Sequence, residues 1–173
     1  NCIRDGAPDA WGRRVIINRK LGTGGTQVDV AQLDELTYLL ESGSDRIGAL
    51  DFQLSSSEYK PRSTTSATLD ELLEAAECVE KGLPLTPELD QALHHGSSIG
   101  GARPKALIED HDKKYVAKFS SSSDVYSVVK AEFIAMRLAE IVGLDVAPVT
   151  LKKVAHKDVL LIERFDRVLS PQG

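Results

Sequence analysis

The second half of the sequence orders its segments in a way that few folds accommodate. In chain order the segments are strand-like stretches at 105–109 and 114–119, a helical pattern at 125–142, and strand-like stretches at 146–154 and 159–165. The first two stretches meet at His111-Asp112, as the arms of a β-hairpin do, and Gly143 ends the helix. This order predicts a small antiparallel sheet packed with one helix, an α+β fold.

The first 95 residues predict mainly helices. Helical patterns cover 10–19, 30–40 and 69–81, and a short helix opens at 86–88. Asp9 is placed to cap the first helix. Alternation over 48–54 predicts one half-buried strand, and the Ser/Thr-rich stretch 55–66 predicts an exposed loop. We therefore divide the chain into a helical segment, 1–95, and an α+β unit, 96–173.

Composition narrows the class of protein. The chain has 173 residues, 42% of them hydrophobic, and no apolar run of the length that a membrane span needs. The N-terminus lacks the pattern of a signal peptide. The only two cysteines, Cys2 and Cys78, form neither a disulfide framework nor a metal set, so we expect a cytoplasmic protein without a metal site of the zinc type.

Charge is unevenly distributed along the chain. The net charge of -5 argues weakly against a broad nucleic-acid surface. Residues 1–95 carry 9 Lys/Arg and 16 Asp/Glu, a net of -7, whereas residues 96–173 carry 12 and 10, a net of +2. The second half is therefore the better candidate for binding an anion such as a phosphate.

A loop rich in small residues, 97–105, precedes the first strand. Glycines let a backbone approach a phosphate closely, and successive N–H groups can surround an anion. Taken alone, this loop is more simply a plain turn. Lys118 lies in the second strand, on the same face as Val116. There it is either exposed to solvent or binds the phosphates of a nucleotide.

Glu132 lies in the helical pattern at a position that distinguishes two interpretations. At 100° per residue it falls near the middle of an arc of apolar residues, Val125, Val128, Val129, Ala135, Met136 and Ala139. If the helix is rotated, Glu132 is simply exposed. If the arc faces the sheet, the carboxylate needs a partner, and we favour a buried pair with Lys118. A loop, a lysine and a glutamate in this order are typical of the nucleotide lobe of protein kinases.

Four motifs resemble those of HipA-like serine/threonine kinases, the toxins of bacterial toxin–antitoxin pairs. The segments that match are 8–14 (PDAWGRR), 98–106 (SIGGARPKA), 116–119 (VAKF) and 160–167 (LLIERFDR). They come in the family's order over nearly the whole chain, and together they are specific. The resemblance implies that 96–173 is a protein-kinase-like N-lobe without its C-lobe, and that the chain is a fragment.

The resemblance also implies site residues and cofactors. ATP and Mg²⁺ would bind the parent protein, and the ATP contacts would come from Gly100, Gly101, Ala102, Arg103, Lys105, Lys118, Glu163, Arg164 and Phe165. Lys118 and Glu132 would form the ion pair that positions the lysine. Ser98 matches a serine whose autophosphorylation switches family members off. For Arg103, a phosphate contact and a contact with a nearby carboxylate are equally open.

The departures from the family bear on activity. The family's catalytic and metal-binding aspartates are expected after Gly173, so no catalytic residue or metal ligand is assigned here, and the fragment is expected to be inactive. The resemblance implies a helix-turn-helix antitoxin (HipB-like) as partner, operator DNA reached through that antitoxin, and an aminoacyl-tRNA synthetase as substrate. Two alternatives stay open: a non-catalytic interaction module that binds an antitoxin or itself, and a small-molecule phosphotransferase, which the 164–167 match disfavours.

Overall fold

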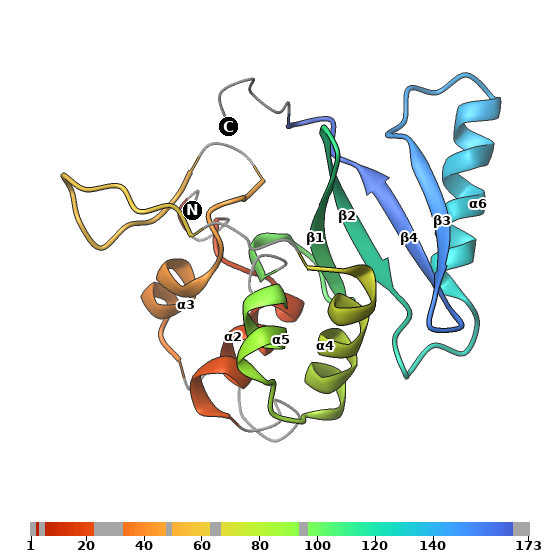
Figure 1. Ribbon diagram of the computed structural model, residues 1–173. Coiled ribbons are helices and arrows are strands. Elements are labelled where there is room, and N and C mark those ends of the chain that lie inside the picture. Colours follow the sequence, from red (N-terminus) through yellow and green to blue (C-terminus); the bar gives the residue numbers. More distant parts are fainter. Residues whose placement is uncertain are drawn as a thin grey trace.

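The structure is a computed structural model and describes residues 3, 6–22, 33–47, 50–62, 67–93 and 97–167 (Figure 1). The expected α+β class is confirmed. The helices of the first half are α2 (Ala10–Leu21), α3 (Glu35–Glu41), α4 (Leu69–Lys81) and α5 (Pro87–Leu93). The second half contains β1 (Lys105–Asp110), β2 (Lys113–Phe119), α6 (Val128–Ile141), β3 (Val149–Val154) and β4 (Lys157–Glu163).

The four strands form one antiparallel sheet in the order β1-β2-β4-β3. Figure 1 shows the helices of the first half on one side of the sheet and α6 on the other, against β3. On the side of the first half, Ala117 and Phe119 of β2 join Trp11 of α2 and the apolar face of α4 in the main core. The sheet therefore lies between the helical segment and α6.

Helix ends follow from local residues. Thr68 accepts a hydrogen bond from the Glu71 N–H and the Glu71 carboxylate bonds back to the Thr68 N–H, a capping box that starts α4. Gly82 ends this helix with φ 70°, a conformation that glycine adopts without strain. Helix α6 begins at Val128 rather than at 125, because Ser127 caps it by accepting the Lys130 N–H.

The strand predicted over 48–54 is wrong for residues 50–54, which form no strand. Asp51 accepts the N–H of Phe52 at 2.8 Å and the side-chain amide of Gln53 at 2.8 Å. Such local side-chain bonds satisfy the chain without a partner strand. Residues 55–62 form neither helix nor strand. They are exposed, except for Arg62, which is half-buried. Residues 30–32, 48–49 and 63–66 of the predicted elements lie outside the described residues.

Asp51 makes the stability of this region dependent on pH. Burial acts to raise its pKa, but hydrogen bonds from Ser44, Gln53 and the Phe52 N–H, with the charge of Arg62, lower the pKa from 3.8 to about 2. The unfolded carboxyl group takes up its proton at a higher pH than the folded one. The stabilisation is therefore present above pH 3.8 and is lost as the pH falls through about 2.

We expect Asp51→Asn to lower the free energy of unfolding by about 2 kcal/mol at pH 7. The difference between the two proteins should shrink steadily below pH 4 and be small at pH 2, where about half of the folded protein still carries the Asp51 charge, because the folded-state pKa is about 2. Urea unfolding followed by circular dichroism across this range measures it. A difference that stays constant from pH 7 to pH 2 would contradict the role of the charge.

Candidate nucleotide site

The glycine loop is held by the start of α2. The Gly101 N–H donates to the Asp9 carboxylate at 2.7 Å, and the Trp11 N–H donates to the Gly101 carbonyl at 3.1 Å. Gly101 has φ 106°, where a side chain would be strained, and an added Cβ would lie 2.4 Å from Lys105 Nζ. The loop therefore needs glycine at this position for its conformation, and an added Cβ would also displace the end of the Lys105 side chain.

Asp9 begins α2 but does not cap it with its side chain, so that part of the expectation is wrong. Its carboxylate oxygen instead accepts the Gly101 N–H. An added Cβ on Gly100 would lie 2.9 Å from the same oxygen. The acidic residue of the 8–14 motif is thus joined to the glycine-rich motif 92 residues away.

Two lysines lie side by side on the sheet face that α6 covers. Lys105 and Lys118 are direct cross-strand partners in β1 and β2, so their side chains share a face. Lys105 is buried and donates to the Gly100 carbonyl at 2.6 Å. Burial and the charge of Lys118 lower the pKa of Lys105, while Asp9 and Glu132 act in the opposite direction. A pair of cations beside a glycine loop favours an anionic ligand.

Lys118 and Glu132 are brought together, with Nζ and Oε1 2.5 Å apart. Their side chains are 28% and 32% exposed, so the pair is half-buried and not buried as expected. The reason is that α6 covers the sheet only partly: Val129 is its one buried residue. Ala135 and Val125 of the expected arc are exposed, as are Ile134, Leu138 and Ile141.

Arg103 contacts a carboxylate. Its Nη1 and Nη2 donate to the two oxygens of Asp124 at 2.9 and 2.5 Å, and the Ser121 N–H donates to Asp124 as well. The hydrogen bond that Arg103 donates to Asp124 raises the pKa of Arg103. Arg103 therefore joins the glycine loop to the turn after β2, which favours the second of the two interpretations left open. Ala102 beside it is exposed.

An apolar row crosses the sheet next to the lysines. Register places Leu107, Val116, Ile162 and Val149 in one line across all four strands. Val116 lies two residues from Lys118 on the same face, because strand side chains alternate. Leu107 is buried and the other three are half-buried. The sequence did not indicate this row, because the alternation of each strand is visible in it but the register between strands is not.

In the 163–167 segment, two of the three side chains expected to contact ATP bond to other residues of the protein. Glu163 pairs with Lys113 at 2.7 Å. The Arg164 side chain is buried, donating to Asp45 at 2.9 Å and to Asp166 at 2.6 Å. Phe165 is 90% exposed. The side chains of Glu163 and Arg164 are therefore engaged within the protein. Their backbone N–H groups are engaged as well, donating to the Pro148 and Lys114 carbonyls at 2.9 and 2.8 Å, so that Phe165 is left for a ligand.

Over the described residues, no group of three or more His, Cys, Asp or Glu side chains is arranged to hold a metal ion. Within the same residues, none of the helices combines the length and apolar character that crossing a membrane demands.

Residues 97–172 match the family model of the HipA-like C-terminal domain. This is a family of kinases. The match covers the glycine loop, the sheet and α6. None of the curated proteins matches the chain.

Proposed function

We propose that residues 97–167 bind the phosphates of ATP, as the nucleotide lobe of a HipA-like serine/threonine protein kinase. One observation carries the proposal: the Lys118–Glu132 pair lies on the same sheet face as Lys105, directly after a glycine loop. A glutamate that fixes a lysine in this way is how protein kinases position the lysine on the α- and β-phosphates. The match of this region to a family of kinases supports the same function.

Different residues of the chain suit the phosphates and the base of a nucleotide. Lys118 and Lys105 offer cationic groups to the phosphates, and the apolar row of Leu107, Val116, Ile162 and Val149 offers a surface for a purine base. In the proposal, the 163–165 segment meets the base through Phe165. Magnesium would accompany ATP and neutralise the phosphates, and no described residue is assigned as its ligand.

The proposed activity is transfer of the ATP γ-phosphate to a serine or threonine of a protein, with an aminoacyl-tRNA synthetase as substrate and a helix-turn-helix antitoxin as partner. The residues that the structure describes are proposed to bind the nucleotide, and none of them is assigned a catalytic role.

Ser98 is the proposed autophosphorylation site. Its hydroxyl donates to the Asp45 carbonyl at 3.0 Å and is partly buried. A phosphate would remove this donor and add roughly two negative charges beside the loop, where ATP phosphates are proposed to lie. Ser98→Glu should therefore weaken ATP binding, which isothermal titration with ATP and Mg²⁺ measures.

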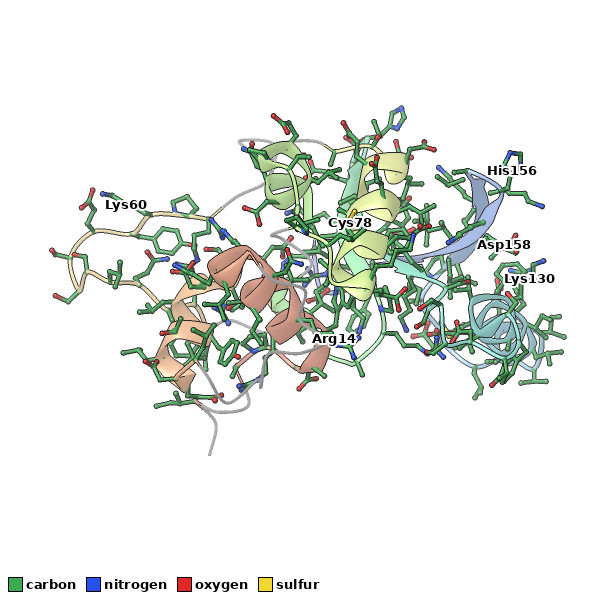
Figure 2. The ribbon with its side chains drawn as sticks, turned by 90° about the horizontal axis from the view of Figure 1, so that it is seen from below. Arg14, Lys60, Cys78, Lys130, His156 and Asp158 are labelled. Carbon is green, nitrogen blue, oxygen red and sulfur yellow. The ribbon has the colours of Figure 1, made fainter. Side chains whose placement is uncertain are left out.

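We expect Lys118→Ala to weaken ATP binding at least tenfold, because a hydrogen bond to a charged group contributes about 1.5–3 kcal/mol. Isothermal titration with ATP and Mg²⁺ measures it. Lys130→Ala is the matched control: Lys130 of α6 also forms an ion pair, at 2.9 Å to Asp158, and Figure 2 shows the two residues together. Equal affinity of the unaltered protein and Lys118→Ala would contradict the assignment.

The second candidate is a non-catalytic interaction module. The observation that favours it is the exposed apolar side of α6, which includes Ile134, Leu138 and Ile141. Binding of an antitoxin or of a second copy that persists in Lys118→Ala, together with no measurable ATP affinity in either protein, would favour the module over the nucleotide lobe.

A further inference from the structure

Asp45 lies outside the helices and strands and collects contacts from three distant parts of the chain. Its carboxylate accepts hydrogen bonds from Arg164 at 2.9 Å, from Arg167 at 2.8 Å and from Lys114 at 3.0 Å. Its backbone carbonyl accepts the Ser98 hydroxyl at 3.0 Å. One residue thus contacts the start of the glycine loop, strand β2 and the segment after β4.

The neighbouring residue, Arg46, fixes Asp45 to the helical segment. The buried Arg46 guanidinium donates to the Leu39 carbonyl at 2.6 Å and to the Gly6 carbonyl at 2.8 Å. Its own carbonyl accepts Arg164 Nη2 at 3.1 Å and also a bond from Arg167. Residues of the first half of the chain therefore fix the position of the backbone next to Asp45.

The charge of Asp45 matters in this position. Burial acts to raise its pKa, but the hydrogen bonds from Lys114 and Arg167 and the charge of Arg164 hold the pKa below its ordinary value. Two other carboxylates lie near these cations: Asp166 bonds both arginines, and Glu109 is the cross-strand partner of Lys114. Removing the charge of Asp45 would leave Lys114 without the carboxylate it bonds.

The glycine loop and the 164–167 segment both lie outside the ladder of the sheet. The Gly101 N–H donates to Asp9, and the Arg164 N–H donates to the Lys114 carbonyl. Asp45 contacts both segments. In the proposed nucleotide site, the loop meets the phosphates and this segment meets the base, so the distance between them must suit the ligand.

We propose that Asp45 is a positioning residue that holds the start of the glycine loop and the 164–167 segment in register for nucleotide binding. The inference rests on the proposed function for its effect on ATP. The coupling of the two segments is a property of the chain itself and is measured separately.

The test compares Asp45→Asn with Glu77→Gln by hydrogen–deuterium exchange and by titration with ATP and Mg²⁺. Glu77 is the matched control, because its carboxylate also joins the helical segment to the sheet, through Lys157 at 2.6 Å, without contacting the loop or 164–167. In Asp45→Asn we expect exchange at least tenfold faster in 163–167, because Arg164 and Arg167 bond the carboxylate. The increase in 97–104 should be smaller, because the Ser98 hydroxyl bonds the Asp45 backbone carbonyl, which the substitution keeps. Exchange in the β1–β2 hairpin should be unchanged, and ATP affinity should fall about tenfold. Glu77→Gln should show none of these changes, and Asp45→Glu should restore part of the affinity.

Three outcomes overturn the inference: unchanged exchange in either segment, faster exchange spread evenly over the chain, or faster exchange with unchanged ATP affinity. If the unaltered protein does not bind ATP, the proposed function fails and so does the nucleotide part of the inference, while the exchange pattern still decides whether Asp45 couples the two segments. If Asp45→Asn does not fold, Ser98→Ala removes the hydroxyl that bonds the Asp45 carbonyl. It should then speed exchange in 97–104 and, to a smaller extent, in 163–167, and faster exchange in 97–104 alone overturns the coupling.

Discussion

Replacing Trp11 by alanine is expected to lower the free energy of unfolding by about 3–5 kcal/mol. Trp11 is fully buried in the main core, where it packs with residues of α4, α5 and the sheet. Its indole N–H also donates to the Lys105 carbonyl at 2.8 Å, at the first residue of β1. The substitution therefore opens a cavity and leaves a buried carbonyl without its donor.

Trp11→Phe separates most of the two contributions, because it removes the N–H and keeps most of the apolar volume. We expect a smaller loss, about 1–3 kcal/mol. Trp11 is the only tryptophan, so urea unfolding must be followed by circular dichroism. Tyr59→Ala, which removes an aromatic ring that is 61% exposed, serves as control and should change stability by less than about 0.5 kcal/mol. A loss below 1 kcal/mol in Trp11→Ala would contradict the role of Trp11 in the core.

The elements that could be predicted from the sequence are those whose signals are local. Helix α4 begins at Thr68 and ends before Gly82 because both caps lie within a few residues of the helix. The β1–β2 hairpin turns at His111, as its flanking alternation indicates. The 48–54 pattern misled, because alternation describes a strand only when a partner is available. There Asp51 bonds to its own neighbours instead.

The ion pair of the site was predictable because helix and strand periodicity fix the direction in which each side chain points. The positions of Lys118 in its strand and Glu132 in its helix indicated a pair before any contact was known, and the two lie 2.5 Å apart. Their half-exposed state was not predictable, because it depends on how much of the sheet α6 covers. That coverage is a matter of packing between elements, which no spacing within α6 encodes.

Contacts between distant segments left no signal in the sequence. The Asp9 carboxylate reaches a glycine 92 residues away, and Asp45 reaches Arg164 across 119 residues. Seen locally, Asp9 has the position of a helix cap, and Arg164 belongs to a motif expected at the nucleotide. The structure gives both side chains partners inside the protein. The loop and the 163–167 segment are thus supported by residues whose sequence context suggested other roles.

Gly12→Ala is expected to destabilise the protein by about 2–3 kcal/mol, although it replaces a glycine inside a helix. In an ordinary helix the same change stabilises by up to about 1 kcal/mol, because alanine is the better helix former. At Gly12 an added Cβ would lie 2.0 Å from the Ser97 carbonyl oxygen and 2.7 Å from Pro8 Cβ. Both contacts are far shorter than atoms tolerate, so either α2 or the start of the glycine loop must move.

Because the clash falls on Ser97, the effect should extend from stability to the loop. Urea unfolding measures the first, and titration with ATP and Mg²⁺ measures the second, where we expect weaker binding. Arg14→Ala is the control: it lies two residues further along α2, its side chain is exposed, and Figure 2 shows it on that helix. It should change neither quantity appreciably. A Gly12→Ala protein as stable as the original would mean that α2 and the loop are not in the close contact on which the support of the glycine loop depends.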